Sequence, residues 1–194
     1  MPKTSNIQVE EVLESLSRGE SPTIMVPYKK TTIPIKISFG EESATHYDAE
    51  GNPVSITLRQ ARKFDLHKAL GHELGHIERK LRYGALPETR EKKVKFKGKY
   101  VLVPDEDAQL RDMLKDELWA ENWAIKKRGQ QWTPRRLASF ITSCAEIFQY
   151  DNYDAWKLAK PVIDRLGISS HTISKTLKIL KSQPEWPEGP WVKE

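Results

Sequence analysis

Two glutamates on a predicted buried helix face constrain the fold more than any other feature of the sequence. The period of the apolar residues predicts a helix from about Asp105 to Arg128. On this helix Glu117 and Glu121 lie one turn apart in the middle of the apolar stripe, while most of the charged residues occupy the opposite side. The stripe consists of Leu110, Met113, Leu114, Leu118, Ala120, Ala124 and Ile125. Because a buried carboxylate is costly unless it is paired or bound to a metal, the fold has to provide a partner for both glutamates.

An earlier helical segment, from about Lys63 to Tyr83, contains the sequence G-H-E-L-G-H. Its apolar stripe, which buries the helix against the rest of the protein, consists of Leu66, Leu70, Leu74, Ile77 and Leu81. His72 and His76 lie on the opposite side, one turn and about 6 Å apart along the axis, so their imidazoles can converge on one point. Glu73 is rotated by about 100° from His72 and therefore lies beside that point. In this pattern, H-E-x-x-H, two histidines bind Zn²⁺ and the glutamate takes a proton from a water molecule.

The two helices together can supply one metal site. A catalytic zinc ion usually has three protein ligands, so a carboxylate would complete the set begun by the histidines. Of Glu117 and Glu121, one would bind the metal and the other would hydrogen-bond a ligand histidine and fix its tautomer. Gly71 and Gly75 lie four residues apart on the first helix and would let the second helix approach closely.

Two interpretations need no metal. The histidines could be exposed on a charged helix face, and the glutamates could form buried salt bridges with Arg79 or Arg82. The spacing does not decide whether Glu117 or Glu121 is the ligand. Zinc is the expected ion, but two imidazoles and a carboxylate also accept other divalent metals.

The order of the remaining elements predicts an α+β fold. A short helix is expected over residues 7–18, followed by the β-like runs TIMVPY, IPIKISF, ATHYD and VSITL. The last two runs flank the turn sequence D-A-E-G-N-P, and a second hairpin is expected from KVKF and KYVLV. After Thr133-Pro134, a helix-start signal, the chain is helical. We therefore expect an N-terminal segment over residues 1–22, a core domain with a small sheet and the two metal-binding helices over 23–130, and a helical C-terminal region with a Pro-rich tail over 131–194.

Composition indicates a soluble protein. No apolar run approaches the roughly 20 residues that span a bilayer, and acidic residues stand where a secretory signal would be apolar. Cys144 is the single cysteine, so no intrachain disulfide can form and a cytoplasmic location without a membrane partner is expected. The net charge is +5, and residues 61–100 hold 12 Lys/Arg against 5 Asp/Glu. Much of this excess lies in the second hairpin, which is either a solvated, lysine-rich element or a contact for phosphates or an acidic protein.

The motifs of the two helices resemble those of zincin metallopeptidases with a glutamate third ligand. The chain is most similar to the small intracellular ImmA/IrrE-like peptidases of bacteria and their mobile elements. Members share H-E-[L/I/F]-G-H after a small sheet, then a helix with the pattern E-x-x-A-[N/D]-x-[F/W]-A, and residues 117–124 read E-L-W-A-E-N-W-A. The resemblance covers about residues 50–125. It implies a zincin-like fold in which His72, His76 and Glu117 bind zinc and Glu73 is the general base. Glu121 stands where Asn or Asp is more usual, and a role beside a ligand histidine is expected for it.

The function that this resemblance implies is zinc-dependent hydrolysis of peptide bonds, with a specific intracellular protein as substrate. Tyr83 and Tyr100 are candidates for stabilising the oxyanion of the transition state. The strand that contains Val54, Ile56 and Leu58 is expected to be a sheet edge that an extended substrate could join. The alternative function is that of a DNA- or protein-binding regulator with a structural zinc site or without catalysis. The sequence shows neither the substrate nor the oligomeric state.

The C-terminal region contains a pattern similar to a helix-turn-helix over residues 166–181. Ile173 and Leu177 are expected to face inward, and the expected exposed face consists of Ser170, His171, Ser174, Lys175 and Lys178. Pro161 in the first helix and the near-neutral charge of the region count against DNA binding, and a helical bundle is the alternative. In the tail, Trp186 and Trp191 could dock the terminus or form an exposed partner site.

Overall fold

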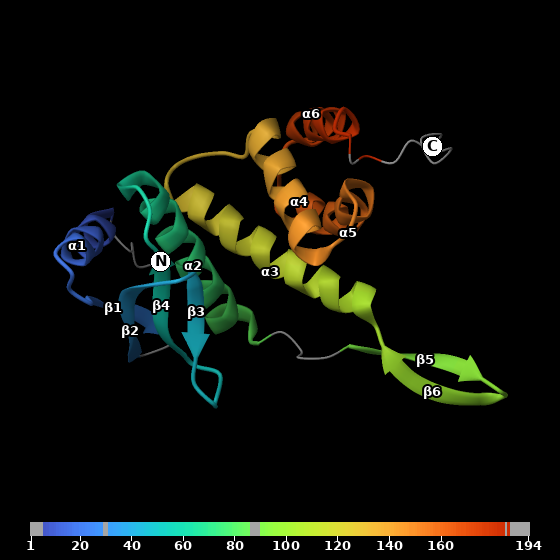
Figure 1. Cartoon of the computed structure of the whole chain (residues 1–194), viewed down its shortest axis with the longest axis horizontal. Helices are drawn as coiled ribbons and strands as arrows, with labels where there is room; N and C mark the ends of the chain where they lie inside the picture. Colours follow the sequence, from blue (N-terminus) through green and yellow to red (C-terminus); the bar gives the residue numbers. More distant parts are fainter. Residues whose placement is uncertain (1–5, 29–30, 86–89, 185, 187–194) are drawn as a thin grey trace. The chain divides into compact units, whose positions relative to one another are not determined.

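The computed structural model describes residues 6–28, 31–85, 90–184 and 186, which form helices, a mixed sheet and a hairpin (Figure 1). The helices are α1 (Asn6–Ser17), α2 (Lys63–Tyr83), α3 (Glu106–Lys127), α4 (Pro134–Phe148), α5 (Asn152–Arg165) and α6 (Ser170–Lys181). The strands are β1 (Thr23–Tyr28), β2 (Thr31–Gly40), β3 (Ala44–Tyr47), β4 (Pro53–Arg59), β5 (Glu91–Phe96) and β6 (Lys99–Pro104). The predicted α+β class and order of elements are confirmed. No helix within the described ranges is long and apolar enough to cross a membrane.

The chain divides into two compact units. The first comprises Met1–Ala85 with Trp119–Arg128, and the second comprises Leu86–Leu118 with Gly129–Glu194. The sequence predicts a boundary near residue 130, with the second hairpin inside the core domain. In the structure that hairpin and the first half of α3 are part of the unit that contains the C-terminal helices.

The sheet of the first unit has the strand order β1-β2-β4-β3. β1 pairs with β2 and β3 pairs with β4 in antiparallel fashion, whereas β2 and β4 are parallel. The predicted turn between β3 and β4 is closed by Asp48, whose carboxylate accepts a 2.7 Å hydrogen bond from the backbone N–H of Asn52. This hydrogen bond lowers the pKa of Asp48.

The prediction that β4 is a sheet edge is wrong. β4 lies between β2 and β3 and is hydrogen-bonded on both sides, so no added strand can join it. Of the three residues proposed to meet a substrate, Ile56 and Leu58 are fully buried and only Val54 is exposed. The position of β4 just before α2 in the chain suggests a sheet edge. The parallel pairing of β4 with β2 instead places β4 inside the sheet. Among the described strands of this sheet, the edges are β1 and β3.

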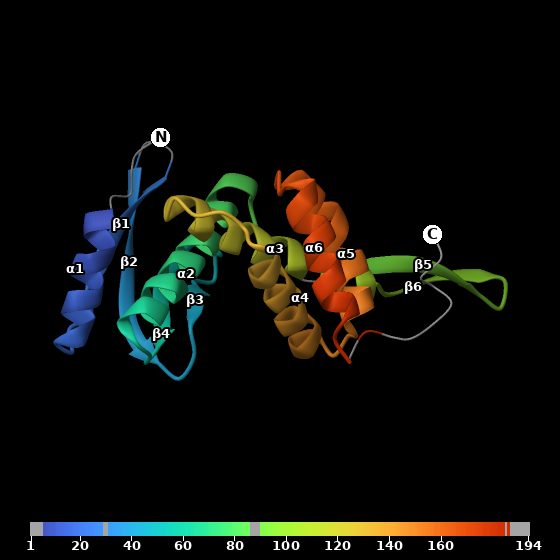
Figure 2. The same cartoon turned by 90° about the horizontal axis from the view of Figure 1, so that it is seen from above.

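The core of the first unit lies between the sheet and the helices α1 and α2 (Figure 2). The predicted apolar stripe of α2 is buried at Leu66, Leu70, Leu74 and Ile77, and Leu81 is partly buried against the same core. The sheet contributes Ile35, Ile37, Ile56 and Leu58, and α1 contributes Val12, Leu13 and Leu16. Because this stripe fixes how α2 packs, it also fixes which residues of α2 face away from the sheet.

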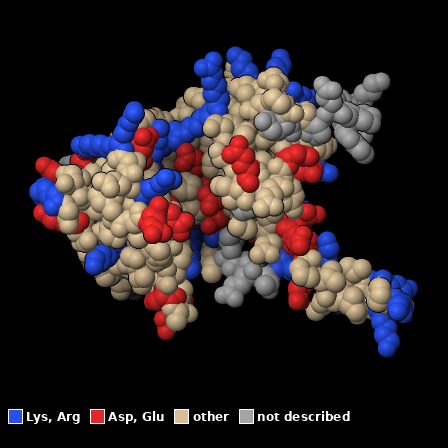
Figure 3. All heavy atoms as spheres, viewed as in Figure 1, with Lys and Arg blue, Asp and Glu red and all other residues tan. Residues whose placement is uncertain are grey.

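The second unit contains the β5–β6 hairpin and the helices α4, α5 and α6. The hairpin turns at Lys97 and Gly98, which have positive φ values of 46° and 82°. Val103 is partly buried, and all the other strand residues of the hairpin are exposed. Lys or Arg side chains are visible at its tip (Figure 3). The hairpin is therefore exposed and lysine-rich, and the contact with phosphates or an acidic protein stays a prediction.

One prediction for the C-terminal region is confirmed, and one of the two alternatives for the tail is found at Trp186. The Thr133 side chain caps α4 by accepting a hydrogen bond from the backbone N–H of Arg136 at 3.2 Å, with Pro134 in the first turn. Trp186 is buried and packs edge-on against Tyr153 at 5.5 Å between ring centroids, so this part of the tail is docked. Trp191 lies outside the described residues.

The Cys144 thiol is expected to be unreactive in the folded protein. It is buried in a small core with Leu110 and Leu114, and burial, with an added effect from the charge of Glu117, raises its pKa from the usual 9.0 to about 12. Because the folded-state pKa is the higher one, this group stabilises the fold below pH 9, and that contribution is lost as the pH rises toward 12. We expect labelling by a disulfide reagent at pH 8 to be at least about 100-fold slower than in denaturant. Equal rates in the two conditions would contradict the buried position.

Candidate metal centre

His72 and His76 converge as their spacing predicts. They lie one turn apart on α2, on the side away from the buried leucine stripe, and are half-buried. Their Nε2 atoms are 3.0 Å apart, and the rings meet edge-on with centroids 4.7 Å apart. Two nitrogen ligands of a tetrahedral zinc ion would lie about 3.3 Å apart, given Zn–N bonds of about 2.05 Å. The separation of the two rings therefore fits a metal of that size with only a small adjustment.

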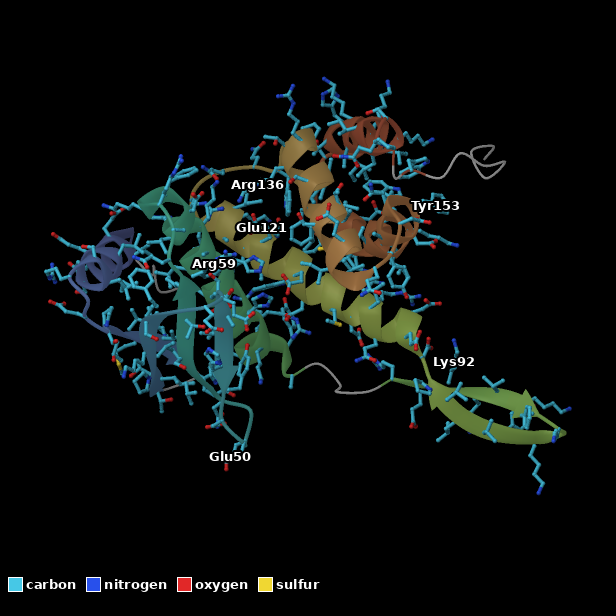
Figure 4. The ribbon with its side chains drawn as sticks, in the orientation of Figure 1. Glu50, Arg59, Lys92, Glu121, Arg136 and Tyr153 are labelled. Carbon is cyan, nitrogen blue, oxygen red and sulfur yellow. The ribbon has the colours of Figure 1, made fainter. Side chains whose placement is uncertain are left out.

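Glu121 fixes the orientation of His72. Its Oε2 lies 3.1 Å from His72 Nδ1, and the Glu121 side chain, labelled in Figure 4, is 16% exposed. A carboxylate accepts a hydrogen bond from the protonated Nδ1, which leaves the lone pair on the Nε2 atom of His72, where a metal would bind. The hydrogen bond that the sequence analysis expected between one glutamate and a ligand histidine is thus present, and it is made by Glu121.

Glu117 offers the third ligand atom. One carboxylate oxygen of Glu117 and one ring nitrogen each of His72 and His76 all lie within 4.8 Å of one another, and all three residues are half-buried. Glu117 lies on the same continuous helix as Glu121, one turn earlier. Two imidazoles and one carboxylate could bind a divalent metal ion such as zinc. Glu121 contacts Nδ1 of His72 and Glu117 belongs to the cluster, so the geometry favours Glu117 as the third ligand.

Arg82 and Arg79, the two arginines considered as partners of the glutamates, each make a contact near the end of α2. The Arg82 guanidinium donates a hydrogen bond to Glu78 at 2.8 Å, which raises the pKa of Arg82. The Arg79 guanidinium donates to the backbone carbonyl of Gly84 at 3.3 Å. Both contacts are local to the end of α2.

Glu73 is a buried carboxylate with a hydroxyl partner. It is 6% exposed, and its Oε2 accepts a 2.8 Å hydrogen bond from the Thr45 hydroxyl of strand β3. Within the described residues this is its one hydrogen-bonded side-chain partner, and no cation pairs with it. An ionised carboxylate in such a position is costly unless a positive charge lies nearby. Glu73 also follows His72 directly in the sequence, so a metal at the His72–His76–Glu117 cluster would supply that charge.

Sequence reasoning missed Thr45. It was assigned only to a strand, and the pairing of β3 with β4 is what brings that strand beside α2. A hydroxyl residue in a strand is common, so the sequence contains no signal that singles out Thr45.

The close approach of α2 and α3 depends on Gly75. A Cβ atom at Gly75 would lie 2.6 Å from the backbone oxygen of Ala120 and 2.7 Å from its Cα. At Gly71 the nearest atoms to such a Cβ are side-chain atoms, Arg128 Nη1 at 3.3 Å and Ala124 Cβ at 3.5 Å. Both glycines were expected to admit the second helix, and the contact is much tighter at Gly75.

The two tyrosines proposed as oxyanion stabilisers are exposed. Tyr83, the last residue of α2, is 63% exposed, and its ring packs edge-on against Trp119. It follows His76 by seven residues, which is about 10 Å along a helix axis. Tyr100 is 72% exposed and belongs to β6 in the second unit. Neither position adds support to the proposed role.

The stripe predicted for α3 is largely confirmed. Leu110, Leu114, Leu118, Ala120, Ala124 and Ile125 are buried. One residue of the stripe differs from the expectation, because Met113 is 40% exposed. Glu117 and Glu121 are half-buried rather than fully buried, which suits side chains that reach a metal-binding position.

Comparison of the chain with protein-family models, with curated proteins and with solved structures finds no match. The inference of function therefore depends on the geometry of the residues described above.

Proposed function

We propose that the chain is a zinc-dependent metallopeptidase with a zincin-like arrangement, similar to the ImmA/IrrE-like peptidases. The observation that carries the proposal is the cluster of two histidines and a glutamate together with the buried carboxylate of Glu73, the residue that follows the cluster residue His72 in the chain. A structural zinc site is usually closed by four protein ligands, whereas a catalytic site has three and leaves one position for water. The cluster found among the described residues offers three ligands, with Glu73 outside it. The regulator with a structural zinc site is therefore the weaker candidate.

In this proposal His72, His76 and Glu117 hold the metal. A zinc ion supplies Lewis-acid polarisation of the scissile carbonyl and lowers the pKa of a water molecule. The Glu121 carboxylate keeps the His72 ring in the tautomer and orientation that present Nε2. Glu73 accepts a proton from the attacking water and donates it to the leaving amine, and the Thr45 hydroxyl holds the Glu73 side chain in position.

The substrate class that we propose is a specific intracellular protein, cleaved in the cytoplasm. This part of the proposal is an analogy with the small peptidases that the motifs resemble.

The change Glu73→Gln tests the catalytic role. It keeps the size of the side chain and the contact with Thr45 but removes the base, so we expect cleavage to fall by about 10²–10⁴-fold while the metal content stays the same. The measurement is mass spectrometry of new N-termini formed when a library of proteome-derived peptides is incubated with the zinc-loaded protein.

Glu78→Gln is the matched control, since Glu78 is another glutamate of α2 and contacts Arg82 instead of Thr45. It should leave the cleavage rate unchanged. Equal cleavage by Glu73→Gln and wild type, or no cleavage of any library peptide by a wild-type chain that contains its metal, would overturn the peptidase proposal.

A further inference from the structure

Helices α5 and α6 follow one another through a short turn, in the order of a helix-turn-helix, and both pack on α4. α5 ends at Arg165 and α6 begins at Ser170, so four residues connect them. Gly167, with φ of 70°, turns the chain directly after the end of α5, and the Ser169 side chain caps α6 by accepting from the backbone N–H of Thr172. A connection of three to four residues that contains Gly is typical of this unit. Pro161, which counted against the pattern, lies on an exposed face within a continuous α5.

The buried side of α6 faces α4. Thr172, Thr176 and Leu180 are buried, and the Thr176 hydroxyl donates to the backbone carbonyl of Thr172 at 2.7 Å. The same hydroxyl lies 3.3 Å from the carbonyl oxygen of Pro134 at the start of α4. Ile173 and Leu177, expected to be the inward residues, are only half-buried. These contacts set which face of α6 is turned outward.

The outward face of α6 is basic and polar. It consists of Ser170, His171, Ser174, Lys175, Lys178 and Lys181, all exposed. No Asp or Glu occurs in α6 or in the first turn of α4, where Arg135 and Arg136 lie. Basic side chains project from α4 and α6 along the upper edge of Figure 3, and Arg136 is labelled there in Figure 4.

The start of α4 and the face of α6 share one shallow depression. Its lining consists of Thr133, Pro134, Arg135, Lys175, Lys178 and Ile179. Arg135, Lys175, Lys178 and Lys181 have no ion pair with any described residue of the chain. In contrast, Lys160 on α5 is paired with Asp164 at 2.6 Å. The positive charge of this surface is therefore available to an external partner.

We propose that this surface, defined as Arg135, Arg136, His171, Ser174, Lys175, Lys178 and Lys181, binds duplex DNA with α6 in the major groove. An α-helix fits that groove, and α6, with 12 residues, is about 18 Å long. The side chains at its exposed face donate hydrogen bonds, which suits phosphates and base edges. A protein partner would call for an apolar centre, and the apolar residues of α6 are half-buried or buried instead. This inference is independent of the proposed peptidase activity.

The experiment is fluorescence anisotropy of a mixed-sequence 25-bp duplex with the full chain over a range of KCl concentrations. If the five Lys and Arg side chains each neutralise one phosphate, log K should fall against log salt with a slope of about −4.5. Lys175→Ala/Lys178→Ala should reduce the slope by about 1.8 and weaken binding at least about 10-fold at 50 mM salt. Lys175→Gln/Lys178→Gln, which keeps the aliphatic stems, should give the same result with an unchanged melting temperature.

Lys93→Ala/Lys95→Ala is the matched control, because it removes the same charge from two exposed residues of the hairpin. It should retain wild-type affinity. The proposal would be overturned if the wild-type chain does not bind the duplex at 25 mM salt. It would also be overturned if the hairpin variant, and not the α6 variant, loses affinity for the duplex. Equal affinity for a double-stranded RNA of the same sequence would also overturn it, since the major groove of RNA is too narrow for a helix.

Discussion

Replacing Glu117 by alanine is expected to reduce the zinc content from about one ion per chain to less than about 0.1 when the protein is purified without added metal. The change removes one of the three ligand atoms that lie within 4.8 Å of one another. The two remaining imidazoles hold a divalent ion much more weakly. Elemental analysis of the purified chains measures the result directly.

Two further variants identify what each glutamate does. Glu121→Ala keeps the three ligand atoms and removes only the hydrogen bond to His72 Nδ1, so zinc affinity should fall by about 10–100-fold without being lost. Glu106→Ala, a change at an exposed glutamate in the first turn of α3, should leave the metal content unaltered. Full retention of zinc by Glu117→Ala, with loss in Glu121→Ala, would reverse the assignment of the two side chains. Absence of metal in wild type after zinc is added back would refute the site itself.

The second large effect is expected from Gly75→Ala. The added methyl group would lie 2.6 Å from the backbone oxygen of Ala120, a distance at which α2 and α3 have to separate because neither backbone can rotate out of the way. Overpacking of this kind typically costs 1–3 kcal/mol and can exceed that range, and here we expect a loss of roughly 3 kcal/mol in the free energy of unfolding. In a chain of this size, such a loss lowers the melting temperature by roughly 6–12 °C.

Gly71→Ala is the matched control, one turn earlier on the same helix. Its methyl group would meet the end of the Arg128 side chain at 3.3 Å and Ala124 Cβ at 3.5 Å, so the neighbours can adjust. Alanine also has a helix propensity about 1 kcal/mol better than glycine. We expect the stability of this variant to lie within about 1 kcal/mol of wild type. Similar thermal midpoints for the two variants would contradict the close contact at Gly75.

Zinc affinity should separate the two variants as well. Movement of α3 away from α2 shifts Glu117 and Glu121 relative to His72, so Gly75→Ala should bind zinc more weakly even under conditions where it is folded. This makes Gly75 a residue that acts on the site through helix packing rather than through contact with the metal.

The elements of the fold were predictable where a periodic signal marks them. The helices α2 and α3 were located to within a residue or two because their apolar stripes each extend over about four turns. The β3–β4 and β5–β6 hairpins were found from their turn sequences. Pairing order within the sheet was not predictable in this way, because the parallel contact of β2 with β4 joins strands that are not neighbours in the chain. That contact is what made the assignment of β4 as an edge wrong.

The candidate site was predictable to the extent that helix geometry determines it. The convergence of His72 and His76 follows from their spacing of one turn, and the inward positions of Glu117 and Glu121 follow from the stripe of α3. The division of roles between the two glutamates needed the structure, because both lie within about 20° of the same direction on the helix wheel. Thr45 could not be found, since its contact with Glu73 depends on strand pairing.

Helix α3 has residues in both units, and this affects how the protein can be made and divided. Ala120 follows Gly75 by 45 residues, so during synthesis α2 and the sheet leave the ribosome well before the helix that covers Gly75. A fragment that ends at residue 85 would lack Glu117 and Glu121, and any longer fragment that contains them also contains the β5–β6 hairpin. Every contiguous fragment that contains the candidate metal ligands therefore also contains the hairpin, and the cluster can assemble only after α3 has been synthesised at least as far as Glu117.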